Sequence, residues 1–327
     1  MPTGPTHAIV AVTYRCNARC TMCDIWKKSP GRELGPKDYG RLPPSLKEIN
    51  VTGGEPLLRE DLTEIIRTLK ERCAGARIVL STNGLLPSRL RAVLEDTGGI
   101  AVRVSVDGLG QLHDRIRGTK GAYDRAMESL EVARDLGVKD VGICATMSRH
   151  NAGAIRDVQS TAQKHRVQFT FTVAHSSPVF FGEKRSEEPP AEPALRDMAE
   201  IKSRLFASGR PKDWFKGYFV QGMMEMMQGR PRPVRCRAGV DFFYLDPEGG
   251  VYPCHLWDRP IGNILEKTYE EMIAEHREVL AETAACRRRC WMTCTVAPEM
   301  RRRLPVFAAR VGWAKALHHL KAVAKTR

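Results

Sequence analysis

The sequence predicts an α/β fold built from parallel strand–helix repeats, and three observations support this prediction. Six short apolar runs rich in β-branched residues occur between positions 8 and 173. Amphipathic helical patterns separate successive runs, and glycine, asparagine or aspartate follows several of the strand ends. Alternation of this kind is typical of parallel βαβ units, whose functional sites lie at the carboxyl ends of the strands.

The predicted elements follow one another in regular order. The six strands cover residues 8–13, 47–52, 77–82, 101–106, 141–146 and 167–173. The first reads as a buried parallel strand because it is short, apolar and β-branched. A helix beginning near Asp61 places Leu62, Ile65 and Ile66 on one face. Further helices are expected near 86–96, 121–136 and 151–165.

The pattern changes after the sixth strand. Residues 183–193 are rich in Glu and Pro and predict an exposed linker or lid. Helices are predicted near 193–207, 213–228 and 268–282, and a β-hairpin joins 242–245 to 251–252. The predicted divisions are 1–178 for the strand–helix repeats, 179–235 for a helical linker or lid, 236–298 for a small α+β domain, and 299–327 for a tail.

Composition limits the class of protein. The 42% hydrophobic and 28% charged residues are typical of a soluble globular protein. No apolar run approaches the ~20 residues that span a bilayer, and no secretory signal begins the sequence. Eight of the ten cysteines fall in two groups, whereas Cys73 and Cys144 stand alone in apolar settings. Grouped cysteines without a signal indicate metal or cluster ligation in a reducing cytosol, so we expect a cytoplasmic protein.

The net charge of +14 favours an anionic partner. The partner could be a phosphorylated substrate, a nucleic acid, an acidic peptide or an anionic membrane surface. A basic solvated surface without any partner also explains the charge. No aromatic-rich basic strand face supports a nucleic acid, so none is expected.

The first cysteine group is Cys16-x3-Cys20-x2-Cys23, directly after the first strand. Three thiolates at this spacing can hold three corners of a cubane iron–sulfur cluster and leave its fourth iron open. A zinc finger needs a fourth Cys or His close by, and none lies within ten residues of Cys23. The array resembles the signature of the radical S-adenosylmethionine (SAM) superfamily, whose fold is an open partial (β/α)6 TIM-like barrel.

The strand ends extend this resemblance. Gly53-Gly54-Glu55-Pro56 follows the second strand and is similar to the GGEP motif, which in the family receives the amino group of SAM. Two glycines allow close approach of the backbone, and a carboxylate accepts from an ammonium. The resemblance further implies polar contacts to the ribose and carboxylate of SAM from Ser81, Asn83, Ser105, Asp107 and Asn151. Ordinary turn chemistry is the alternative for these residues. Met22 stands where the family often has an aromatic residue, so we expect weaker stacking on the adenine.

The resemblance also implies the chemistry. In the family, a reduced 4Fe–4S cluster cleaves SAM to methionine and a 5′-deoxyadenosyl radical, which takes a hydrogen atom from an unactivated carbon. The cofactor carries this step, and the protein positions the substrate and excludes water. A flavodoxin- or ferredoxin-type protein is the expected electron donor.

The second cysteine group is similar to the auxiliary-cluster domains called SPASM and twitch. Cys236-x12-Gly249-x4-Cys254 matches their opening motif, and Cys286, Cys290 and Cys294 follow. Five cysteines cannot ligate two 4Fe–4S clusters, so one auxiliary 4Fe–4S cluster is expected, with two of the last three cysteines completing its ligands. A structural zinc site is the alternative. We expect this cluster to accept an electron from the substrate, which makes the reaction an oxidation.

The C-terminal tail is strongly basic, with eight Lys or Arg residues and one acid between positions 299 and 327. Apolar residues recur there at helical spacing, Trp313 among them. A basic amphipathic helix with a Trp indicates a membrane-surface element. A helix packed on the barrel and a disordered tail are the alternatives.

These observations favour a radical SAM oxidoreductase acting on a small-molecule, lipid-linked or peptide substrate. The alternative with the same fold is a redox-neutral reaction, such as epimerisation or transfer of an adenosyl or methyl group. A zinc or iron–sulfur nucleic-acid-binding protein is the alternative of another class.

Overall fold

The computed structural model describes residues 4–29, 31–175, 177, 187–232, 234–286 and 290–325. The predicted boundary at 178/179, part of the predicted linker at 183–193 and the last two residues of the tail lie outside the described residues.

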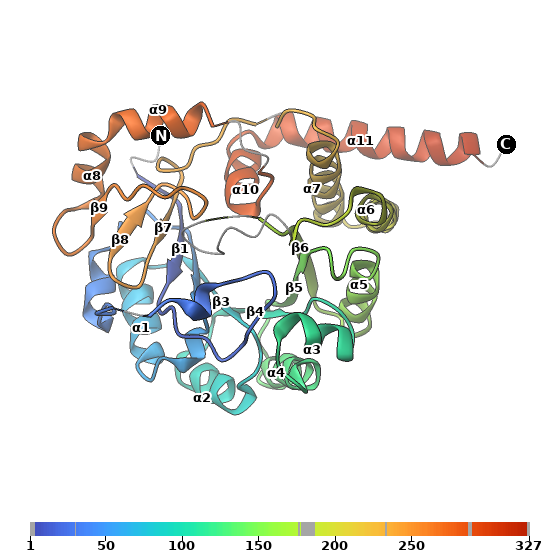
Figure 1. The fold of residues 1–327 in the computed structure, drawn as a ribbon. Coiled ribbons are helices and arrows are strands. Elements are labelled where there is room, and N and C mark those ends of the chain that lie inside the picture. Colours follow the sequence, from blue (N-terminus) through green and yellow to red (C-terminus); the bar gives the residue numbers. More distant parts are fainter. Residues whose placement is uncertain are drawn as a thin grey trace.

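A single nine-stranded sheet organises the chain (Figure 1), with the strand order β6-β5-β4-β3-β2-β1-β7-β8-β9. The six predicted strands are confirmed as parallel neighbours: β1 (His7–Ala11), β2 (Glu48–Thr52), β3 (Arg77–Thr82), β4 (Ala101–Ser105), β5 (Val141–Met147) and β6 (Gln168–Val173). The fold class is therefore the open six-unit barrel that the sequence predicts.

The C-terminal hairpin continues this sheet. Strand β7 (Phe242–Leu245) pairs in parallel with β1, and Ile9 lies opposite Tyr244. Strands β8 (Gly250–Tyr252) and β9 (Gly262–Asn263) then add in antiparallel order. No local pattern signals this pairing, because the paired residues lie more than 230 positions apart in the chain.

Helices cover the outer face of the barrel and cross its open side. Those of the six repeats are α1 (Leu62–Arg72), α2 (Pro87–Thr97), α3 (Gln111–Arg117), α4 (Ala122–Asp135) and α5 (Ile155–Lys164). Short 3-10 turns are η1 (Ile25–Lys27), η2 (Pro36–Arg41) and η3 (Pro56–Leu58). Later helices are α6 (Ala191–Ala207), α7 (Pro211–Met227), α8 (Tyr269–Glu275), α9 (Arg277–Ala284), α10 (Thr293–Arg302) and α11 (Leu304–Lys325). The single helix predicted near 268–282 is wrong in one respect, because the backbone leaves helical geometry at His276 and separates α8 from α9.

The core lies between the sheet and its outer helices. Ile49, Leu80 and Val102 on successive strands are completely buried, as are Leu62 and Ile65 of α1. Full burial of one such side chain stabilises the fold by about 1.5–3 kcal/mol. The amphipathic face predicted for α1 is therefore the face that covers the sheet.

Helices α7 and α10 close the open side of the barrel around one tryptophan (Figure 1). Trp291, 1% exposed, donates its Nε1–H to the carbonyl of Phe219 in α7 at 2.7 Å. Its ring packs against the backbone at Gly222, where a Cβ atom would overlap with the indole. Trp291 directly follows Cys290, so this packing also fixes the start of α10.

No helix among the described ranges is long and apolar enough to cross a membrane.

The substitution Gly222→Ala should lower the free energy of unfolding by about 1–3 kcal/mol, because its methyl group overpacks against Trp291. Gly312→Ala in α11 is the matched control, since a Cβ atom there meets nothing within 4 Å, and it should stabilise by up to about 1 kcal/mol. Thermal and urea denaturation measure both. Equal effects of the two substitutions would contradict this account of the packing.

Candidate active site

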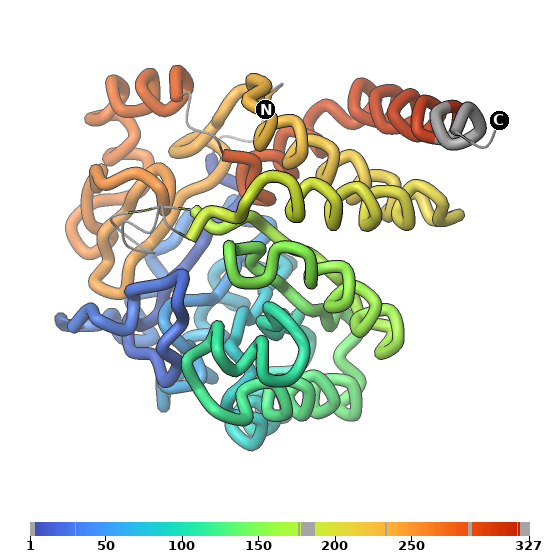
Figure 2. The backbone as a smooth tube through the Cα atoms, turned by 45° about the vertical axis from the view of Figure 1, so that its right-hand side comes forward, coloured from blue at the N-terminus to red at the C-terminus, as the bar shows by residue number. Residues whose placement is uncertain are grey.

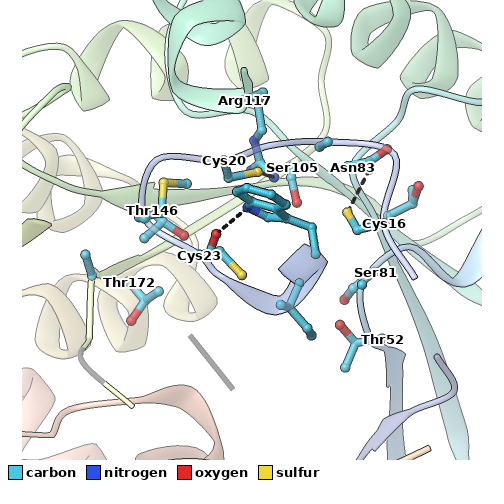
Figure 3. Close-up of a pocket in the computed structure, with 18 of the residues that line it drawn as sticks. Cys16, Cys20, Cys23, Thr52, Ser81, Asn83, Ser105, Arg117, Thr146 and Thr172 are labelled. Carbon is cyan, nitrogen blue, oxygen red and sulfur yellow. Dashed lines mark hydrogen bonds between the residues drawn. The ribbon is translucent and has the colours of Figure 1, made fainter. Parts of the chain in front are cut away.

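A cavity of about 190 Å³ opens at the carboxyl ends of the barrel strands (Figure 3). Its lining residues fall into three groups: the first cysteine group with Met22 and Trp26, residues at strand ends, and residues from distant segments. The strand-end residues are Thr52, Gly53, Gly54, Ser81, Thr82, Asn83, Ser105, Thr146 and Thr172. The cavity therefore lies at the strand ends, where the sequence analysis expects the site.

Cys16, Cys20 and Cys23 all face this cavity. Their loop has little regular structure and is fixed by the end of α3, because Arg19 and Thr21 donate backbone N–H groups to the carbonyls of Arg117 and Ile116 at 2.9 Å. Burial raises the pKa of Cys16 to about 11 and that of Cys23 to about 12. Free thiols in this setting stay protonated, and they become thiolate ligands when a metal centre replaces the protons. Three thiols around one cavity are a donor set that suits an iron–sulfur cluster.

The Gly53-Gly54 pair brings the end of β2 against this loop. Gly53 has φ of +146°, and a Cβ atom at either glycine would overlap with the carbonyl of Thr13 or Arg15. Gly54 donates its N–H to Thr13 O at 2.7 Å, and Glu55 donates its N–H to Arg15 O at 2.8 Å. The motif therefore positions the cysteine loop through the backbone.

Glu55 and Pro56 do not line the cavity. Glu55 is completely buried, and its carboxylate accepts from the Thr82 hydroxyl at 2.8 Å, from Asn83 N–H at 2.7 Å and from Leu57 N–H at 3.1 Å. Burial raises the pKa of Glu55 to about 7 against the effect of these donors. The structure thus gives this carboxylate a bracing position between the ends of β2 and β3.

Ser81, Asn83 and Ser105 present polar groups to the cavity, whereas Asp107 and Asn151 lie behind it. Asn83 donates to Asn17 Oδ1 at 2.7 Å, which links the end of β3 to the cysteine loop. Asn151 donates to the carbonyls of Asp107 and Thr146 at 2.7 and 2.8 Å. Asn151 therefore joins two strand ends.

Arg117 is a cavity residue that the sequence analysis missed. It forms an ion pair of 2.6 Å with fully buried Asp107 and places Nη1 3.8 Å from Cys20 Sγ. The Asp107 carboxylate is the main neighbour that raises the pKa of this guanidinium, against the opposing effect of its burial. Its Nε is buried without a hydrogen-bond partner among the described residues. Arg117 ends α3, 12 residues beyond the end of β4, so it lies outside the strand-end motifs that point to the site in the sequence.

The five C-terminal cysteines come together at a second site. Cys236, Cys254, Cys286 and Cys290 line one small cavity, and Cys294 packs with Cys236 and Cys254. Burial raises the pKa of Cys290 to about 11 and that of Cys254 well above its usual value, and nearby thiols raise the latter further. Within the described ranges, no three Cys, His, Asp or Glu side chains are placed to surround a single metal ion.

A short segment of chain connects the two cysteine sites. Met292, located between Cys290 and Cys294, lines the first cavity together with His175. On the side of β7, the hydroxyl groups of Tyr14 and Tyr244 lie 3.3 Å apart, and the ring of Tyr244 meets His255, the neighbour of Cys254. The sequence offers no signal for Met292, because its position depends on the packing of Trp291.

Comparisons with known proteins agree with this geometry. The radical SAM superfamily model matches residues 10–153, and the iron–sulfur cluster-binding domain called SPASM matches residues 236–295. An AdoMet-dependent heme synthase of Oleidesulfovibrio alaskensis is 33% identical over 296 residues, which cover 82% of this chain and 75% of that protein. The mycofactocin maturase MftC of Mycolicibacterium smegmatis is 26% identical over 288 residues, 83% of this chain and 70% of that protein.

Two further matches differ in extent. An Fe-coproporphyrin III synthase of Methanosarcina barkeri is 36% identical over 155 residues, which are 45% of this chain and only 37% of that protein. The solved structure of anSMEcpe with bound AdoMet shares the fold, with a TM-score of 0.65 and 18% identity over 85% of this chain and 83% of that chain.

Fold, site and comparisons define an enzyme that uses SAM and iron–sulfur clusters. The chain belongs to the radical SAM superfamily. Its C-terminal part carries a SPASM-type iron–sulfur cluster-binding domain, so its cofactors are SAM, a SAM-binding 4Fe–4S cluster and an auxiliary iron–sulfur cluster.

Asp107→Asn should lower the free energy of unfolding by about 3–5 kcal/mol, because it leaves the buried Arg117 guanidinium without its counter-charge. Urea denaturation of the anaerobically reconstituted protein measures the loss. Asp135→Asn, an exposed residue at the end of α4, is the matched control and should change little. A loss below about 1 kcal/mol for Asp107→Asn would contradict the importance of the pair.

Proposed function

We propose that this enzyme oxidises an organic substrate, with the auxiliary cluster as electron acceptor. The observation that carries the proposal is the position of Met292, which lines the first cavity and stands in the chain between Cys290 and Cys294 of the second site. Short separation between a reacting carbon and an acceptor favours electron transfer over a redox-neutral outcome. Epimerisation or group transfer is the competing result.

The proposed ligands follow from the two sites. Cys16, Cys20 and Cys23 hold the SAM-binding cluster. Cys236 and Cys254 hold the auxiliary cluster, with two of Cys286, Cys290 and Cys294. When bound, SAM with its cluster supplies a carbon radical that takes hydrogen from an unactivated C–H bond.

The chain's own residues bind and orient SAM. We assign the polar parts of SAM to the strand-end groups of Ser81, Asn83 and Ser105, which point into the cavity (Figure 3). The unpartnered Nε–H of Arg117 is a donor for the SAM carboxylate. Met22 and the Gly53-Gly54 backbone complete the lining, while Glu55, Pro56, Asp107 and Asn151 support it from behind. A flavodoxin- or ferredoxin-type protein is the proposed reductant.

Relatives suggest two kinds of substrate. Some are named as a mycofactocin maturase or a PqqA peptide cyclase, and the anSMEcpe structures include complexes with peptides. Others are named as heme synthases. These names support a peptide as one candidate substrate. The choice between a peptide and a smaller molecule depends on the surfaces of this chain near the cavity.

Anaerobically reconstituted protein should contain about eight iron atoms, falling to about four in a Cys16/Cys20/Cys23→Ala variant. A Cys236→Ala/Cys254→Ala variant should also keep about four and still cleave SAM, yet lose substrate oxidation. Iron and sulfide analysis with EPR measures this. Cys73→Ala is the control, since Cys73 lies buried outside both sites, and it should keep all eight. About four iron atoms in the unmodified protein would favour redox-neutral chemistry instead.

We also propose that α11 contacts an anionic membrane. One face of the helix packs on the body through Phe307, Val311 and Ala314, while the helix extends away from it (Figures 1 and 2). Trp313 and Leu320, 69% and 66% exposed, lie seven residues apart on the other face. Arg310 is exposed on the same helix, Arg302 and Arg303 precede its first residue and pair with Glu299, and Leu304–Lys325 contains no acidic residue. Exposed Trp and Leu beside cations fit the boundary between headgroups and acyl chains.

Trp313→Ser/Leu320→Ser should weaken binding to vesicles containing phosphatidylserine about tenfold, through lost apolar burial. Flotation of the full chain on anionic and neutral vesicles measures it. Leu109→Ser/Leu265→Ser removes two similarly apolar exposed side chains elsewhere and should change nothing. Equal binding by both double variants would count against a membrane role of α11.

A further inference from the structure

An apolar groove lies at the open edge of the barrel, outside the cavity described above. Its volume is about 350 Å³, and β6, α6, α7 and α10 form its walls. Phe171, Ile201, Phe215, Val220 and Met300 provide most of the lining. Figures 1 and 2 show these helices gathered beside β6, which is the edge strand of the sheet in the described part of the chain.

The groove continues toward the reaction cavity on two walls. Thr170 of β6 lines the groove and Thr172 lines the cavity, and residues two apart on a strand share a face about 7 Å apart. On the opposite wall Thr293 lines the groove and its neighbour Met292 lines the cavity. A molecule lying in the groove therefore has one end close to the site of hydrogen abstraction.

The other end of the groove meets a basic hollow of about 700 Å³, and the two share Lys212 and Lys216. The hollow is lined by six cationic side chains, which are Arg134, Lys139, Arg166, Arg210, Lys212 and Lys216, and by one acid, Asp213. Asp213 is paired with Arg210 at 2.9 Å.

Most of the positive charge in the hollow is unmatched. Arg134, Lys139, Arg166 and Lys212 make no ion pair with other described residues, and Lys216 donates only to the neutral amide of Gln168 at 3.0 Å. Lys216 is half-buried and lines both the groove and the hollow, so it places a positive charge where the two meet. Unpaired cations gathered at one place repel one another, and an anion relieves that repulsion.

We propose that the groove and the hollow together bind an amphipathic anion, with its apolar body in the groove and its carboxylate or phosphate among Lys212, Lys216 and the hollow's arginines. A neutral apolar molecule leaves the cations unmatched, and a hydrophilic anion leaves the groove walls exposed. That this ligand is the enzyme's substrate rests on the proposed function; its binding does not.

Two fluorescent probes test the binding on full-length, anaerobically reconstituted protein. Anilinonaphthalene sulfonate is apolar and anionic, and N-phenylnaphthylamine is apolar and neutral. Lys212→Gln/Lys216→Gln should raise the Kd of the anionic probe about tenfold and leave that of the neutral probe within about twofold. Lys37→Gln/Lys120→Gln, exposed lysines away from the groove, is the charge-matched control and should change neither. Equal weakening of the anionic probe by both double variants would overturn the proposal.

A second variant tests the apolar part. Ala297→Phe, on half-exposed α10 surface inside the groove, should weaken both probes by filling the space. Unchanged binding of both would show that the probes bind elsewhere and would overturn the proposal. The lysine variants change only Lys212 and Lys216, where the groove meets the hollow. They therefore still test the proposal even where Ala297→Phe fails to fold.

Competition identifies the anion. Dodecanoate or dodecyl phosphate should displace the anionic probe, and the stronger of the two identifies a carboxylate or a phosphate; dodecanol should displace it at least tenfold more weakly. Displacement by hexaglutamate as strong as by either amphiphile would overturn the assignment in favour of an acidic peptide.

SAM cleavage is measured in the same samples. The absence of SAM cleavage in the unmodified protein would contradict the proposed function alone. Binding of the anionic probe that does not change in the Lys212→Gln/Lys216→Gln variant would contradict the groove proposal alone.

Discussion

The close contact between the cysteine loop and the end of β2 is the constraint on which the rest of the structure depends. A loop without regular structure must keep three thiols around one buried cavity. It achieves this through backbone bonds from Gly54 and Glu55 to the loop carbonyls and through the α3 carbonyls of Ile116 and Arg117. No side chain fits between β2 and the loop, because a Cβ atom at Gly53 or Gly54 would overlap with it.

Polar groups near this cavity divide into those that face it and those that hold it. Ser81, Asn83 and Ser105 face the cavity. The carboxylate oxygens of Glu55 and Asp107 instead accept hydrogen bonds from the protein, and Asp107 also pairs with Arg117. The division follows from burial, since a carboxylate removed from water needs several donors or a cation. The same charge balance, through the ion pair with Asp107, holds Arg117 beside Cys20, with Nη1 3.8 Å from its sulfur.

Continuity of the sheet relates the two cysteine sites. Pairing of β7 with β1 joins the C-terminal part to the barrel, and the Trp291 packing sets α10 across its open side. Met292 thereby lines the reaction cavity, and it lies in the chain between Cys290 and Cys294 of the second site. The same helix, with α7, forms the groove beside β6. One packing arrangement thus sets both the position of Met292 in the reaction cavity and one wall of the groove proposed to bind an amphipathic anion.

The sequence by itself determined the six strands, the superfamily and the gathering of Cys16, Cys20 and Cys23 at the strand ends, because strand periodicity and cysteine spacing are local. The tertiary structure decided what depends on distant segments. The β7–β1 pairing, the approach of Arg117 to Cys20, the place of Met292 in the cavity wall and the braced carboxylate of Glu55 all arise from contacts between residues far apart in the chain. Such contacts follow from close packing and from the need to satisfy buried charge, neither of which leaves a periodic pattern in the sequence.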